Sequence, residues 1–138
     1  MTGPDFLDTN VLVYAYDVSN TNKRRAAREF LKNGISARFV ISTQVLAEFA
    51  AAMLHKISPA ASPDAVMEAL DALAALRLIV PDHELVRRAI EARVSYGLHF
   101  YDGMIIAAAE RAGCERIWSE DLNEGQQYFG VTVANPFH

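Results

Sequence analysis

The 138-residue chain has a single cysteine, Cys114, and no excess of positive charge. One cysteine cannot form an internal disulfide, and it cannot supply a zinc site built from several cysteines. We therefore expect Cys114 to be an ordinary small buried residue. The formal net charge is −4, so the overall charge does not attract nucleic acid. Bound divalent cations or a local basic patch could still do so.

The chain also lacks long apolar runs. None approaches the ~20 residues that a membrane-spanning helix requires. The N-terminus has neither the positive region nor the apolar stretch of a signal peptide. We therefore expect a cytoplasmic protein with no membrane contact. Of its residues, 51% are hydrophobic and 22% are charged, which fits one globular domain spanning residues 1–138.

Short apolar runs alternate with helical patterns along the chain. Runs that are apolar on both faces are typical of buried strands in a parallel sheet with helices on both sides. The sequence therefore predicts an α/β fold, a three-layer α/β/α sandwich around a mostly parallel sheet. The expected strands are 5–14 (a strand and its exit), 39–41, 77–81, 116–119 and 131–133, and the expected helices are 23–32, 43–55, 62–76, 82–97 and 101–113.

For one of these helices the sequence also predicts which residues face the core. In the helix that follows Asp82, apolar residues recur at helical spacing, so we expect them to face the core. The residues expected to face inward are Leu85, Val86, Ala89, Ile90 and Val94.

Four acidic residues stand in apolar surroundings: Asp8, Glu48, Asp102 and Asp121. Asp8 directly follows the first apolar run, and Asp121 follows the strand that should end at Ser119. In a parallel sheet the carboxyl ends of the strands meet at one edge, where open α/β folds bind their ligands. Carboxylates that gather there repel one another unless a cation lies among them, and a divalent metal is the simplest such cation.

Each acid also has an ordinary structural interpretation. Asp8 could be a turn residue, Asp102 could be a helix N-cap, and the polar segment 119–124 could be a plain surface loop. If that segment does contribute to a site, either Glu120 or Asp121 could face it. Glu48 is harder to explain in this way, because it lies in the most apolar helix and buried glutamates rarely lack a partner. Together the acids favour phosphodiester hydrolysis, in which metals generate hydroxide and bind the attacking and leaving oxygens.

Four segments along the chain resemble a known family. They are FLDTNVLVYAYD at residues 6–17, STQVLAEFAAAM at 42–53, FYDGMIIAAAERAGC at 100–114 and WSEDLNEGQ at 118–126. In order and separation these segments resemble the PIN-domain ribonucleases, most closely the toxin subunits of VapBC-type toxin–antitoxin modules. The first and last segments are the most specific, and the resemblance covers essentially the whole chain.

The resemblance implies the three-layer sandwich and a toxin with endoribonuclease activity that depends on Mg²⁺ or Mn²⁺. It implies that the four acids are catalytic, with Asp8 and Asp102 as the central metal ligands. Glu48 would bind metal or orient a ligated water, and Asp121 would be an outer or second-metal ligand. The resemblance also implies a homodimer, and a small cognate antitoxin protein whose C-terminal segment covers the acidic site.

Asn10 and Ser119 fall where the family uses polar residues to support the site. The chain departs from the family at Gly103, where alanine usually follows the third acid. Glycine in a helix costs up to ~1 kcal/mol relative to alanine, so we expect Gly103 to loosen the start of its helix. The departure removes no proposed ligand.

A basic cluster in the helix expected at 23–32 is the best candidate for RNA contact. It consists of Lys23, Arg24, Arg25 and Arg28. The alternative interpretation of each residue is a solvated helix face. If the cluster binds phosphates, activity will depend on salt.

Other functions fit the sequence less well. A haloacid-dehalogenase-like phosphatase requires a second aspartate two residues after its nucleophile, where this chain has Asn10. A receiver domain requires an acidic pair before its phosphorylated aspartate, and Asp5 is too far from Asp8. The four histidines form no recognisable acid–base arrangement. The remaining alternative is a non-catalytic PIN-like module that binds RNA or protein, although this chain keeps all four acids.

Overall fold

The computed structural model describes residues 3–33 and 38–137 of the chain. Its strands are β1 (Asp5–Leu7), β2 (Phe39–Ser42), β3 (Arg77–Ile79), β4 (Arg116–Trp118), β5 (Gln127–Tyr128) and β6 (Val131–Ala134). Its helices are α1 (Thr9–Tyr16), α2 (Thr21–Asn33), α3 (Thr43–His55), α4 (Pro63–Leu73), α5 (His83–Tyr96) and α6 (Phe100–Arg111). The strands form one sheet in the order β3-β2-β1-β4-β6-β5, in which only the β5–β6 pair is antiparallel.

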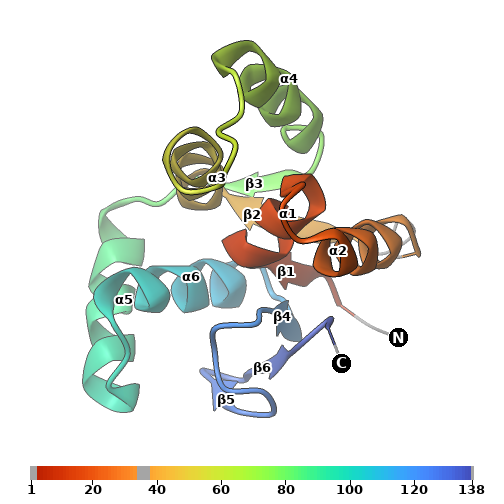
Figure 1. Cartoon of the computed structure of the whole chain (residues 1–138). Coiled ribbons are helices and arrows are strands. Elements are labelled where there is room, and N and C mark those ends of the chain that lie inside the picture. The colour runs from red at the N-terminus through yellow and green to blue at the C-terminus, as the bar shows by residue number, and fades with distance from the viewer. Residues whose placement is uncertain (1–2, 34–37, 138) are drawn as a thin grey trace.

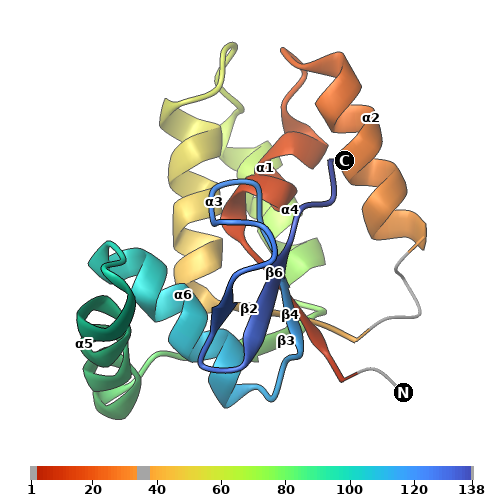
Figure 2. The same ribbon diagram turned by 90° about the horizontal axis from the view of Figure 1, so that it is seen from below.

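Helices cover both faces of this sheet (Figures 1 and 2). On one face α6 packs against β2, β4 and β6, and α5 lies outside it. On the other face Phe30 of α2 packs against Trp118 and Phe39, with ring centroids 4.8 and 5.7 Å away. Helix α3 packs against α1 and carries α4 at the β3 end of the sheet. The predicted mostly parallel α/β sandwich is therefore confirmed.

The structure bears on the expectations for the single cysteine and for membrane-spanning helices. Cys114 is buried, as expected, and burial raises the pKa of its thiol to about 12, so the thiol stays protonated and unreactive. Within residues 3–33 and 38–137, no helix combines the length and apolar character needed to cross a membrane.

The pairing of β1 with β4 positions the functional edge of the sheet. The backbone nitrogen of Asp8 donates to the Trp118 carbonyl at 3.0 Å, so Asp8 and Ser119 leave the sheet side by side. Ser42, the last residue of β2, reaches the same edge and is the N-cap of α3. A Ser N-cap accepts hydrogen bonds from the first helical turn and so begins the helix at the sheet edge. That geometry brings Glu48 of α3 towards Asp8.

The chain turns into a helix directly after Asp8, whereas the sequence predicted a strand and its exit as far as Tyr14. The Asp8 carboxylate caps α1 by accepting a hydrogen bond from the backbone nitrogen of Thr9 at 2.7 Å. The valine-rich sequence favours a strand, but the Asp8 cap and the packing of this segment against α2 and α3 stabilise a helix instead. The residues that α1 buries at helical spacing are Val11, Leu12 and Ala15. The other predicted elements are present with slightly different ends, and β5 was not predicted.

Helix α5 turns a narrower face inward than predicted. Leu85, Ala89 and Ala92 are buried, whereas Val86, Ile90 and Val94 are 37%, 50% and 81% exposed. The prediction was therefore correct for Leu85 and Ala89 and wrong for the three β-branched residues. The physical reason is that α5 and α6 approach so closely that their contact admits mainly small side chains.

Gly103 of α6 lies at this close approach. A Cβ at Gly103 would be 2.7 Å from the Ala89 carbonyl oxygen, which is closer than real Cβ atoms approach a backbone. Gly103 therefore permits the close contact between α6 and α5. The sequence analysis expected only that this glycine would loosen the start of its helix, and it did not predict this packing role. The N-cap interpretation of Asp102 is wrong, because His99 caps α6 by accepting from the backbone nitrogen of Tyr101 at 3.3 Å. Asp102 instead lies in the first turn.

We predict that Gly103→Ala destabilises the fold by about 1–3 kcal/mol, the usual cost of overpacking a tight contact. Helix propensity alone predicts the opposite sign, a gain of up to ~1 kcal/mol. Urea denaturation of the two proteins measures the difference. A variant more stable than the parent chain would show that α5 can move away from α6 without cost.

Candidate active site

The four acids predicted from the sequence line one cleft of about 690 Å³ at the carboxyl edge of the sheet. Asp8 follows β1, Glu48 lies on α3, Asp102 lies in the first turn of α6, and Asp121 lies in the loop after β4. Four segments that are distant in the sequence therefore bring carboxylates to the same space. Asp8 is buried, Glu48 and Asp102 are half-buried, and Asp121 is exposed.

Asp8 is held from both sides by hydrogen bonds. Its Oδ1 accepts from the backbone nitrogen of Thr9 at 2.7 Å, and its Oδ2 accepts from the Ser119 hydroxyl at 2.8 Å. The side-chain nitrogen of Asn10 is a further, longer donor to Oδ2 at 3.4 Å. These neutral donors fix the carboxylate in place but supply no positive charge.

The electrostatics of the site oppose ionisation of its acids. Burial raises the pKa of Asp8 to about 6, against the lowering effect of the hydrogen bonds it accepts, and the charges of Asp121 and Asp102 raise it further. Burial is also the main cause of the raised pKa of Asp102, to which Asp121 and Glu48 contribute, although a nearby histidine opposes it. The acids therefore gather more negative charge than their own hydrogen bonds compensate, and a cation would relieve this repulsion.

Asn10 connects the two acids that follow strands. Its side-chain nitrogen donates to Asp121 Oδ2 at 3.1 Å, and its side-chain oxygen accepts from the Glu120 backbone nitrogen at 3.1 Å. The Ser119 hydroxyl also accepts from the Asp121 backbone nitrogen at 3.1 Å. The two residues predicted to support the site, Asn10 and Ser119, thus lie between Asp8 and Asp121 and hold the loop after β4 against α1.

Glu48 is held by two partners. The Thr9 hydroxyl donates to one carboxylate oxygen at 2.7 Å, and the side chain of Gln44, one turn earlier on α3, donates to the other at 3.2 Å. Gln44 also donates to the Tyr101 carbonyl at 3.1 Å, which connects α3 to the start of α6. The sequence analysis missed Thr9, because it placed that residue in the exit of a strand. An Asp-Thr pair that caps a helix was the available signal.

Glu120 is the other acid of the loop, and it serves a different purpose. The Tyr14 hydroxyl donates to Glu120 at 2.8 Å, and Lys23 of α2 forms an ion pair with it. The Lys23 ammonium also lies over the Tyr14 ring, 4.6 Å from its centroid. Of the two candidate acids in the loop, Asp121 therefore lines the cleft, while Glu120 ties the loop to α1 and α2.

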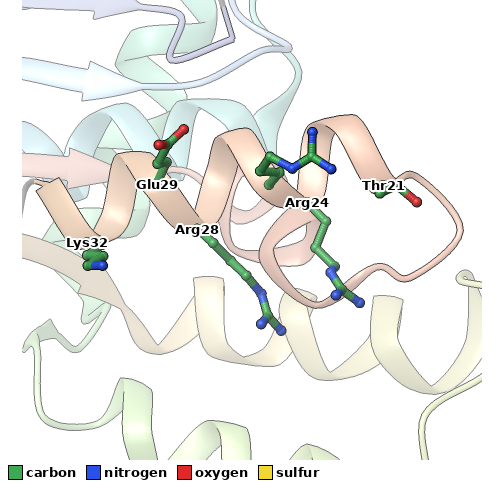
Figure 3. Close-up of a pocket in the computed structure, with 6 residues that line it drawn as sticks. Thr21, Arg24, Arg28, Glu29 and Lys32 are labelled. Atoms are coloured by element: carbon green, nitrogen blue, oxygen red, sulfur yellow. The ribbon is translucent and has the colours of Figure 1, made fainter.

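The basic cluster predicted for RNA contact is divided in the structure. Lys23 is paired with Glu120, and the Arg28 guanidinium donates to the Ala15 carbonyl at 2.7 Å. None of the four predicted basic residues is among those that line the acidic cleft. The residues that line a separate depression of about 340 Å³ along α2 are Thr21, Arg24, Arg25, Arg28, Glu29 and Lys32 (Figure 3).

The donor set of the cleft fits a hard divalent cation. Carboxylate oxygens are the ligands that Mg²⁺ and Mn²⁺ prefer, and the acids of the cleft repel one another. Within the described part of the chain, no three His, Cys, Asp or Glu side chains already converge into a metal cluster. The carboxylates of Asp8, Glu48 and Asp121 instead accept hydrogen bonds from their neighbours. The chemistry and charge of these residues therefore suit a cation.

The family model of the PIN domain matches residues 6–124. The chain belongs to the PIN-domain family. A search of curated protein sequences found no match.

Solved structures share the fold over nearly the whole chain. A toxin–antitoxin complex from Klebsiella pneumoniae is 21% identical, with a TM-score of 0.69 over 96% of this chain and 97% of that one. DNA-bound VapBC from Salmonella typhimurium is 18% identical, with a TM-score of 0.70 over 97% and 98%. Mycobacterium tuberculosis VapC20, described as a toxin that cleaves the sarcin–ricin loop, is 18% identical, with a TM-score of 0.65 over 85% and 91%. At these identities the likeness shows the fold.

We predict that Asp8→Asn stabilises the metal-free protein at pH 8. The folded pKa of Asp8 is about 6, above the ordinary 3.8, so the native state binds more protons than the unfolded state between these values. The free energy of unfolding contributed by Asp8 therefore falls as pH rises through this window. The neutral asparagine side chain avoids this loss of folding free energy, which is about 1–3 kcal/mol at roughly 1.4 kcal/mol per pKa unit.

Urea denaturation in EDTA at pH 4 and pH 8 checks this prediction. The gain should be present at pH 8 and largely absent at pH 4. Asp71→Asn, at an exposed acid of α4, is the matched control and should change little. Equal or lower stability of Asp8→Asn at pH 8 would contradict the raised pKa.

Proposed function

We propose that this chain is an endoribonuclease that depends on Mg²⁺ or Mn²⁺ and hydrolyses RNA phosphodiester bonds, as the toxin of a type II toxin–antitoxin system. The observation that carries the proposal is the gathering of Asp8, Glu48, Asp102 and Asp121 around one cleft of a PIN-family fold. The raised pKa values of Asp8 and Asp102 support a site adapted to hold a cation.

In the proposed site Asp8 and Asp102 are the central metal ligands, as the family resemblance implies; both line the cleft, and a bound cation would lower their raised pKa values. A bound divalent metal would activate a water molecule and polarise the phosphate. Glu48, fixed by Thr9 and Gln44, would bind metal or orient that water. Asp121, more exposed, would be an outer ligand.

The supporting residues act by positioning the acids. Ser119 donates to Asp8, and Asn10 donates to Asp121, so both carboxylates are held with their charge directed into the cleft. No histidine in the described ranges lines this cleft. The proposed mechanism assigns no histidine base, because a bound metal would itself activate the water.

The proposed partners follow from the family and from the similar structures. The titles of two of those structures describe a toxin–antitoxin complex and DNA-bound VapBC. From the family resemblance we propose that this chain forms a homodimer in the cytoplasm and is inhibited by a small antitoxin whose C-terminal segment covers the cleft. Because the cleft is strongly acidic, a basic side chain of that segment would compete with the metal.

We predict that the antitoxin-free protein cuts total RNA into discrete fragments in Mg²⁺ or Mn²⁺, and that EDTA abolishes the cleavage. Asp102→Asn should lower the rate by at least about 100-fold, because it removes a proposed ligand. Asp71→Asn is the matched control at an exposed acid away from the cleft and should cut normally. Gel analysis of the RNA over time measures all four conditions.

Two outcomes would contradict the proposal. Undiminished cleavage by Asp102→Asn would show that Asp102 is not a ligand of the catalytic metal. Folded protein that binds RNA in Mg²⁺ but cuts none of it would favour the non-catalytic RNA-binding module.

A further inference from the structure

The acidic cleft continues well beyond the four acids. It extends along α1 and α3 to the C-terminal end of α3, where Lys56 and Ser58 line it, and it is also lined by Ser19 of the connection between α1 and α2. At 1.5 Å per residue, Glu48 and Lys56 are about 12 Å apart along the α3 axis. One continuous cleft therefore joins the proposed catalytic acids to a lysine at the far end of the helix.

Lys56 differs in charge from the rest of the cleft. Among the described residues that line the cleft, Lys56 is the only lysine, arginine or histidine, and it is exposed. No ion pair involving Lys56 occurs in the described part of the chain. Asp17, another acid that lines the cleft, already accepts hydrogen bonds from the backbone and hydroxyl of Ser19 at 3.0 and 2.6 Å. Lys56 is therefore available to an anion that enters the cleft.

The wall of the cleft also carries an apolar stretch. Ala51 is exposed and has a small side chain, so it leaves room for a ligand above it. Sugar and base surfaces can lie on such a surface while phosphates reach the charged end. The residues that form this apolar stretch are Val13, Ala51, Ala52 and Ile57.

We propose that Lys56, with the Ser58 hydroxyl, forms a second phosphate subsite for single-stranded RNA. This inference rests on the proposed ribonuclease function. At the ~3.4 Å rise per nucleotide of a stacked strand, about 12 Å corresponds to three or four nucleotides. The subsite holds a backbone phosphate at that separation from the bond that is cut, and the intervening nucleotides lie on the apolar stretch. The enzyme therefore prefers substrates that extend several nucleotides to this side.

Binding of a fluorescein-labelled oligouridine 12-mer tests the subsite separately from cleavage. Asp102→Asn serves as the background, because it should bind RNA without cutting it. Adding Lys56→Met should weaken binding and lower the slope of log Kd against log salt by about 0.7, the contribution of one phosphate contact on a single strand. Lys56→Arg should retain both the binding affinity and the slope of log Kd against log salt. Arg38→Met, at an exposed cation on the opposite edge of the sheet, should leave the slope unchanged.

Two alanine variants test whether the RNA follows the cleft. Ala51→Leu should block the apolar stretch and weaken binding as Lys56→Met does. Ala47→Leu, at an exposed alanine one turn earlier on α3 that does not line the cleft, should bind normally. An unchanged slope in Lys56→Met, or normal binding by Ala51→Leu, would overturn the subsite. Cleavage of total RNA by the parent chain is measured independently, so loss of the subsite and failure of the ribonuclease proposal give different results.

Discussion

The pairing of β1 with β4 is the constraint on which the rest of the site depends. One backbone hydrogen bond, from Asp8 to the Trp118 carbonyl, sets Asp8 beside Ser119 at the carboxyl edge of the sheet. The Ser119 hydroxyl can then hold Asp8, and the loop that follows brings Asp121 to the same cleft. A register shift of one residue would turn the side chains of β4 to opposite faces and separate these groups. The local chemistry of the cleft is thus a consequence of sheet geometry.

The same geometry imposes an electrostatic cost. Burial of Asp8 near Asp102 and Asp121 raises its pKa, and the donors around it are neutral. Lys23 of α2 reaches the loop that carries Asp121, but it pairs with Glu120 rather than with an acid of the cleft. Functional sites commonly retain such uncompensated charge where a ligand supplies the opposite sign. The arrangement favours a divalent cation over any cation of the protein itself.

Much of this could be predicted from the sequence, and the failures have physical causes. Buried strands and the four acids were recognisable because apolar runs and isolated carboxylates are local signals. Helix α1 was missed because its valines suit a strand, while the deciding interactions are the Asp8 cap and contacts made from both sides. The inward face of α5 was misjudged because Gly103, on another helix, admits a close contact with Ala89. Lys56 gave no signal, since its place in the cleft depends on where α3 ends.

The distribution of charge also explains how an acidic protein could act on RNA. The net charge of −4 is not spread evenly, because acids gather in the cleft while the arginines of α2 form a separate basic depression and Lys56 stands at the far end of the cleft. In the proposed function the acids would hold the metal, while Lys56 at the far end of the same cleft and the basic depression along α2 would contact phosphates. The exposed Lys56 would be screened by salt in any contact with phosphate, whereas the buried Asp8 would be screened much less. Ionic strength should consequently act on RNA binding more strongly than on the chemical step, since Asp8, a proposed central ligand of the metal, is buried.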